Sequence, residues 1–186
     1  MEFPMVDNVF SGRLLNGERL LWTGQPAKGL LLRAQDALLI PFSLLWCGIP
    51  LFGLLNGGAA GKFGPLVVVP ALFVVVGLYF VFGRFLVDAW LRAATHYAVT
   101  DRRILILRQG TFGSFTAIDL ALLPSLNLKE RGDGRGTIRF GGPAAPWGRN
   151  GMGIWMASAD STPQFLLIGE VRRVFDLIQR TKAAGQ

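Results

Sequence analysis

Few residues in this sequence combine the types and spacing that catalysis or metal binding requires. His96 is the only histidine and Cys47 the only cysteine among 186 residues, too few for a zinc site or an internal disulfide. No Gly-x-Ser-x-Gly motif marks a nucleophilic serine. We therefore expect a non-catalytic protein without metal or cofactor, in which His96 is a hydrogen-bonding or surface residue.

One glycine-rich segment superficially resembles a phosphate-binding loop. Residues 132–136 read Gly-Asp-Gly-Arg-Gly, but the Gly-Lys-Ser/Thr ending of a P-loop is absent. The segment also lies between two predicted strands, whereas a P-loop joins a strand to a helix. Glycine and aspartate are typical of tight turns. We interpret these residues as a hairpin turn.

Two polar segments are candidates for binding. Thr100-Asp101-Arg102-Arg103 reads as a tight reversal that would bring Arg102 and Arg103 to lipid headgroups or to the acidic surface of a partner. The alternative is a turn whose arginines lie in solvent. The loop 143–152 carries Trp147 and Arg149 as a second candidate contact site, with an ordinary loop as the alternative.

The elements that must position these residues begin with two long apolar runs. Residues 37–55 and 63–83 contain no charged side chain. Helices of these lengths would span roughly 28 and 32 Å, about the thickness of the hydrocarbon core of a bilayer. A buried helical pair in a soluble protein is the alternative. We predict a transmembrane hairpin. If it belongs to a larger complex, Gly48, Gly53 and Gly77 are the candidate positions for packing against partner helices.

The distribution of basic residues predicts how the hairpin is oriented. The short loop between the two runs carries only Lys62, whereas basic residues cluster before the first run and after the second. Because cytoplasmic segments carry the excess of Lys and Arg, we expect both termini in the cytoplasm. The flanking basic residues are Arg19, Lys28, Arg33, Arg84, Arg92, Arg102 and Arg103.

Outside the hairpin the pattern is that of a small sheet with one helix. Short segments with strand-like composition or alternation predict seven antiparallel strands. Val171, Val174 and Ile178 then recur at helical spacing, which predicts a C-terminal amphipathic helix. The predicted strands are residues 19–24, 96–100, 103–108, 114–118, 125–129, 137–140 and 154–157.

The net charge of +7 indicates which kinds of partner are expected. Residues 84–186 hold 14 Lys and Arg against 8 Asp and Glu, an excess that suits anionic lipid headgroups. The basic residues are scattered and form no dense run with interleaved aromatics, so we expect no nucleic-acid partner. The positive-inside bias explains much of the excess without any ligand.

The order of these segments resembles the bacterial membrane proteins that carry a pleckstrin-homology-like (PH-like) domain. The resemblance implies a seven-stranded antiparallel barrel closed by a C-terminal helix, with the hairpin inserted after the first strand. It transfers no ligand, because the hairpin replaces the connection that binds inositol phosphates in eukaryotic relatives. The segments that carry the resemblance are Gly17–Pro26, Tyr97–Ile104, Ile118-Asp119, Thr137–Gly141 and the spacing of Phe165, Ile168, Val174 and Ile178.

These observations predict an α+β membrane protein of the bacterial inner membrane. We expect residues 1–36 to hold a lead-in and the first strand, 37–94 the hairpin with a cytoplasmic extension, and 95–186 the rest of the barrel. The expected function is a membrane-anchored binding module for a protein partner or anionic lipid headgroups. A small accessory subunit of a transport or membrane-enzyme complex is the alternative. The sequence is also compatible with a homo-oligomer.

Overall fold

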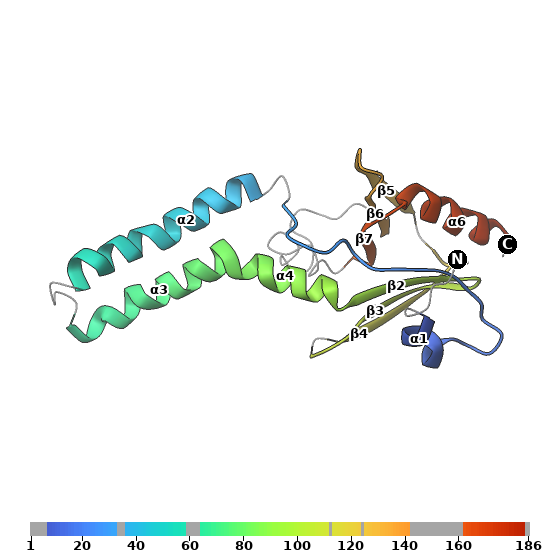
Figure 1. Cartoon of the computed structure of the whole chain (residues 1–186), viewed down its shortest axis with the longest axis horizontal. Coiled ribbons are helices and arrows are strands. Elements are labelled where there is room, and N and C mark those ends of the chain that lie inside the picture. The colour runs from blue at the N-terminus through green and yellow to red at the C-terminus, as the bar shows by residue number, and fades with distance from the viewer. Residues whose placement is uncertain are drawn as a thin grey trace. The chain divides into compact units, whose positions relative to one another are not determined.

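The computed structural model divides the chain into two compact units, which are described separately (Figure 1). The β unit comprises Met1–Lys28 and Trp90–Gln186, and the helical unit comprises Gly29–Ala89. The structure describes residues 7–32, 36–58, 64–111, 113–123, 125–141 and 162–184.

The first sheet of the β unit has four antiparallel strands in the order β1-β2-β3-β4. Strand β1 pairs with β2 although the whole helical unit separates them in sequence, and Trp22 lies opposite Val99. A bulge interrupts this ladder between Leu20 and Trp22. The helical hairpin is therefore inserted between two neighbouring strands of one sheet. The strands are β1 (Leu20–Gly24), β2 (Thr95–Thr100), β3 (Arg103–Arg108) and β4 (Ser114–Asp119).

The second sheet has three antiparallel strands in the order β5-β6-β7. Its last strand corrects the sequence analysis, which predicted no strand at residues 164–168. The strand predicted at 154–157 lies outside the described residues. The three strands are β5 (Leu126–Glu130), β6 (Gly136–Phe140) and β7 (Gln164–Ile168).

The prediction of one closed seven-stranded barrel is wrong for the described residues, because the two sheets share no ladder. Among the residues that the structure describes, one backbone hydrogen bond joins the segment after β1 to β7, from Ala27 N to Leu167 O at 3.1 Å. Pro26 directly precedes Ala27 and has no N–H to donate, so the ladder cannot extend through it. The coarser prediction of an α+β fold with antiparallel sheets and two apolar helices is confirmed.

A C-terminal helix and a short N-terminal segment cover the sheets. Helix α6 (Val171–Ala184) buries Val171, Val174 and Ile178 in the main core, as its spacing predicted. On the other side, α1 (Asp7–Phe10) and a 3-10 turn (Ser11–Arg13) bring Phe10 into a second cluster with Ala98, Leu105 and Leu107. Residues of β2 contribute to both clusters, and every residue of this strand is buried.

The helical unit consists of two helices joined through the segment 59–63, which lies outside the described residues. The first is α2 (Asp36–Gly53), extended by a π turn (Leu54–Gly58). The second contains a 3-10 turn (Gly64–Val67), α3 (Val68–Leu78), a π turn (Tyr79–Gly83) and α4 (Arg84–Ala93), whose last residues belong to the β unit. Both are long and apolar enough to cross a membrane.

Candidate functional site

The β2–β3 turn, the first predicted contact site, holds the start of the β unit together. The Glu18 carboxylate accepts hydrogen bonds from Arg103 Nε and Nη2, both at 2.8 Å, and from Thr100 Oγ1 at 2.7 Å. It also accepts the Leu15 N–H at 2.7 Å. Asp101 fixes the same junction, because its Oδ1 accepts the Arg19 N–H at 3.0 Å. The Thr-Asp-Arg-Arg motif therefore ties the turn to the residues before β1.

The electrostatics of this cluster follow from its geometry. Hydrogen bonds from the Arg103 guanidinium, opposed by burial, bring the pKa of Glu18 down to about 2. The same contact raises the pKa of Arg103. Arg103 is thus bound to its own chain, whereas the neighbouring Arg102 is exposed. The two arginines that the sequence grouped together have different roles.

The position of Arg102 also bears on its predicted contact with headgroups. Strand β2 begins at Thr95, directly after α4, and the turn lies at the other end of the strand. At about 3.3 Å per residue, Arg102 lies roughly 20 Å along the strand from the point where the chain leaves the helices. Arg102 and α4 therefore lie at opposite ends of β2.

The second predicted contact site, with Trp147 and Arg149, lies outside the described residues. The predicted turn at 132–136 does connect two strands, β5 and β6. It is closed by hydrogen bonds from Arg131 N to Arg135 O and from Gly134 N to Arg131 O. Among the described residues, no group of three or more His, Cys, Asp or Glu side chains is arranged to hold a metal ion.

His96 lies on β2 and is buried, so it is not a surface residue. Burial lowers the pKa of its imidazole. Within the part of the chain that the structure describes, its Nδ1 has no hydrogen-bond partner. These features describe a neutral histidine packed within the fold.

The three glycines predicted to pack between helices differ in their surroundings. A Cβ atom on Gly77 would lie 2.6 Å from Cys47 Cβ, so this glycine permits the close contact of α3 with α2. A Cβ on Gly48 or Gly53 would meet no atom within 4 Å among the described residues. Gly77 therefore serves packing within the hairpin, and the other two lie on open surface.

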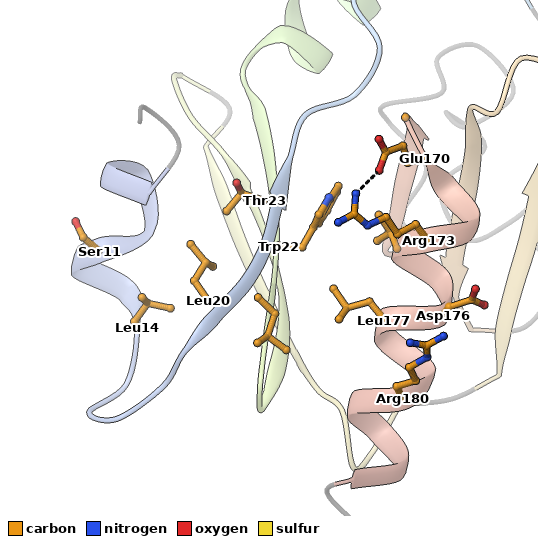
Figure 2. Close-up of a pocket in the computed structure, with 13 residues that line it drawn as sticks. Ser11, Leu14, Leu20, Trp22, Thr23, Glu170, Arg173, Asp176, Leu177 and Arg180 are labelled. Carbon is orange, nitrogen blue, oxygen red and sulfur yellow. Dashed lines mark hydrogen bonds and ion pairs between the residues drawn. The ribbon is translucent and has the colours of Figure 1, made fainter. Parts of the chain in front are cut away.

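The β unit contains one further feature, a groove between β1 and α6 with a volume of about 1140 Å³ (Figure 2). Its two walls differ in polarity, because one is mostly apolar and the other carries charged side chains. Strand β1 contributes Leu20, Leu21, Trp22 and Thr23, whereas α6 and the preceding turn contribute the charged residues Glu170, Arg173, Asp176 and Arg180. Val174 and Leu177 add apolar surface on the helix side.

One wall of the groove is a strand edge. Strand β1 pairs with β2 on one side, and on the other side its residues have no strand partner among the described residues. Trp22 packs against Phe165 with ring centroids 5.5 Å apart, which fixes the inner side of β1. Leu21 is 43 % exposed. Within the described ranges, the groove thus combines a strand edge that no other strand pairs with exposed apolar surface.

This groove was not predicted from the sequence. The strand at 19–24 and the helix at 171–178 were both predicted, but periodicity does not reveal which strand is an edge or which helix flank faces it. The signal that was present is the alternation of charge at Glu170, Arg173, Asp176 and Arg180, beside the apolar stripe of the helix.

Comparison with protein-family models, with curated proteins and with solved structures finds no match to this chain.

Proposed function

We propose that this protein is a membrane-anchored, non-catalytic binding module. In this proposal α2 and the apolar part of the second helix, from Gly64 to Gly83, span the inner membrane of a bacterium, and residues 84–93 form the cytoplasmic extension. The β unit is a PH-like domain on the cytoplasmic side that binds a protein partner. The observation that carries the proposal is the exposure of the two apolar helices.

The exposure separates this hairpin from the core of a soluble protein. In the most apolar 18-residue window of each helix, only 11 % of the residues are buried, although the mean hydropathies are 2.1 and 2.6. Core helices of a soluble protein are mostly buried, because apolar surface left in water is costly. Leu38 and Phe52 are 77 % and 71 % exposed. Such side chains are stable when lipid surrounds them.

The connectivity of the β unit supports the PH-like part of the proposal. Seven strands followed by one C-terminal helix is the order that the resemblance implies, and the described residues follow that order in two separate sheets. The insertion of the hairpin between β1 and β2 is also the arrangement that the resemblance implies. The absence of a closed barrel in the described residues leaves the strand edges open, which suits a module that binds other chains.

A protein partner is favoured over lipid headgroups for a specific reason. The turn with Arg102 and Arg103 was the sharpest candidate for headgroup binding. Arg103 is bound to Glu18, and Arg102 follows the end of β2 opposite to the end that joins α4. The positive-inside bias accounts for basic residues close to the spans, such as Arg84 and Arg92, without a specific lipid site.

Cysteine accessibility tests the anchoring and its orientation. In a Cys47→Ser background, Asn56→Cys places a thiol near the loop between the helices and Arg102→Cys places one on the β unit. A membrane-impermeant maleimide applied to intact bacterial spheroplasts should label the first variant, and should label the second only after lysis. Recovery of the protein in the soluble fraction after alkaline extraction, or equal labelling of both variants from outside, would contradict the proposal.

The alternative function is a small accessory subunit whose hairpin packs against the helices of a larger complex. The observation that favours it is the open surface at Gly48 and Gly53, where a partner helix could approach closely. Gly48→Leu should then release the protein from its membrane partner while leaving the hairpin inserted. If the Gly48→Leu variant keeps the same partners in gentle detergent as the unmodified protein, the alternative fails.

A further inference from the structure

The open edge of β1 has the properties of a peptide-binding site. We propose that the groove between β1 and α6 binds an extended segment of a partner protein, which adds as a strand to the free edge of β1. This inference rests on the proposed binding function and specifies the partner's conformation and side-chain chemistry. Strand addition to an exposed edge is a recurrent mode of peptide recognition, in which the backbone supplies affinity and side-chain contacts supply specificity.

The edge of β1 carries only part of the usual protection of an edge strand. Proteins block such edges with charged residues, prolines, bulges or covering elements. Residues 20–24 read Leu-Leu-Trp-Thr-Gly, with no charge and no proline, although one bulge is present near Leu20. The covering helix α6 stands off from the strand by a groove. An apolar edge that is left open beside a groove is suited to accept another strand.

The two walls match in length. A strand of five residues such as β1 is roughly 17 Å long. The helix face from Glu170 to Arg180 extends over roughly 15 Å. The volume of about 1140 Å³ exceeds the range of about 300–1,000 Å³ that is typical of small-molecule pockets. The groove therefore fits about five residues of extended chain better than a compact metabolite.

The helix wall carries charges that are available to a ligand. Arg173 forms an ion pair with Glu170 at 2.9 Å. Asp176 and Arg180 make no hydrogen bond or ion pair with any described residue. They are four positions apart, about 6 Å along the helix axis. Alternate residues of a strand are spaced by nearly the same distance and point to the same face. Figure 2 shows the Asp176 carboxylate directed away from β1, but exposed side chains change rotamer within nanoseconds. After that rotation, two oppositely charged residues at positions i and i+2 of a bound strand can contact both.

The chain directions predict the order of these two residues. In Figure 2, Thr23 and Trp22 lie toward the Glu170 end of α6 and Leu20 lies toward its Arg180 end, so β1 and α6 run in opposite directions. Antiparallel pairing is slightly more stable than parallel pairing, so the bound strand should run against β1 and along α6. It then meets Asp176 before Arg180. The preferred ligand sequence is basic, apolar, acidic, with the apolar side chain directed toward Leu14 and Leu20.

Two peptide libraries test this prediction with the full-length protein in lipid nanodiscs. Both consist of random nonapeptides, one with a fixed central triad Lys-Val-Glu and the other with Glu-Val-Lys. We expect enrichment from the first library only. The Arg180→Glu variant should bind the selected peptides roughly tenfold more weakly, because an attraction becomes a repulsion. Arg172→Glu is the matched control, since Arg172 lies on the same helix but pairs with Glu130 outside the groove.

Two further measurements test the mechanism. The double variant Asp176→Lys/Arg180→Glu should exchange the preference and select the second library. Backbone N-methylation within the selected peptide should abolish binding, because a strand added to β1 needs its N–H groups. At a peptide concentration of ten times Kd, exchange of the edge amides of β1 should slow about tenfold.

The outcomes are separable from those of the proposed function. Equal enrichment of both libraries, no enrichment, or binding that survives N-methylation would overturn the groove as a strand-addition site, even where maleimide labelling supports the anchored topology. A stable dimer that pairs its two β1 edges and excludes every peptide would also overturn it. Peptide binding of the predicted kind by a chain that fails to insert in the membrane would instead overturn the anchor alone.

Discussion

The two units of this protein place the same kinds of side chain in opposite surroundings. In the β unit, large apolar residues such as Ile104, Ile138 and Phe165 are fully buried. In the helical unit, Leu38 and Phe52 are mostly exposed. Burial of apolar groups away from water stabilises the first arrangement. In the proposed membrane anchor, lipid would stabilise the second arrangement.

A second comparison concerns one buried ion pair in each unit. The Glu18 carboxylate of the β unit accepts bonds from Arg103, Thr100 and Leu15. In the helical unit, Arg84 Nη2 lies 3.1 Å from Asp36 Oδ1, but no Arg84 nitrogen makes a well-aligned hydrogen bond among the described residues. The first pair is well satisfied. The second joins the beginnings of α2 and α4 mainly through charge.

The largest effect on stability is expected at the ion pair between Asp36 and Arg84 in the helical unit. Asp36→Ala leaves Arg84, which is 2 % exposed, without its counter-charge, and loss of one partner of a buried pair typically costs about 3–5 kcal/mol. Hydrogen exchange of the α2 amides in nanodiscs should accelerate accordingly. Glu130→Ala is the matched control, because its pair with Arg172 is exposed and such pairs contribute about 0–1 kcal/mol. Equal effects of the two substitutions would contradict the comparison.

The pair in the β unit should respond to pH. The pKa of Glu18 is about 2 in the folded protein against 4.5 in the reference state, a difference equivalent to about 3 kcal/mol. Because the folded pKa is lowered, this stabilisation is present above pH 4.5 and is lost as the pH falls toward 2. Urea unfolding between pH 7 and pH 2.5 measures it. The Glu18→Gln variant should be less stable at pH 7 and should lose less stability on acidification, and parallel pH profiles would refute the assignment.

The contact between α2 and α3 gives a smaller effect with an internal control. Gly77→Ala would place a methyl group 2.6 Å from Cys47 Cβ and 2.8 Å from its Cα, and such overpacking typically costs about 1–3 kcal/mol. Gly48→Ala has open space and should stabilise its helix by about 0.5–1 kcal/mol. Thermal unfolding in detergent and the maleimide reactivity of the buried Cys47 should both separate the two variants. Similar behaviour would show that the helices do not pack at Gly77.

The smallest effect is expected at Arg102. Its side chain is exposed, so Arg102→Ala should change the free energy of unfolding by less than about 0.5 kcal/mol. Arg103→Ala should cost clearly more, because it removes the main partner of Glu18. Urea unfolding of the two single variants tests this difference. Comparable losses would mean that the ion pair contributes little. Replacing Arg102 and Arg103 together would not distinguish unfolding from lost partner binding. The amount of partner that co-purifies is therefore best compared between wild type and Arg102→Ala.

Strand β7 is an element that the local sequence pattern does not predict. Residues 164–168 read Gln-Phe-Leu-Leu-Ile, an apolar run without the alternation that marks a half-buried strand. Phe165, Leu166 and Ile168 are all buried in β7. Leu167 has a φ of 46°, and the ladder with β6 is irregular between Gly136 and Ile138. An irregular strand that buries neighbouring residues has no regular period from which to predict it.

Some features of this protein are determined by short stretches of sequence. The two charge-free runs specify a pair of apolar helices because length and hydropathy are local properties. The stripe of Val171, Val174 and Ile178 likewise specifies one face of α6. Tertiary structure alone decided that Arg103 binds Glu18, 85 positions away in the chain, and that β1 is an edge strand facing α6. Both relations depend on the pairing of β2 with β1 after the chain has passed through the hairpin. The periodicity of the sequence does not predict this pairing.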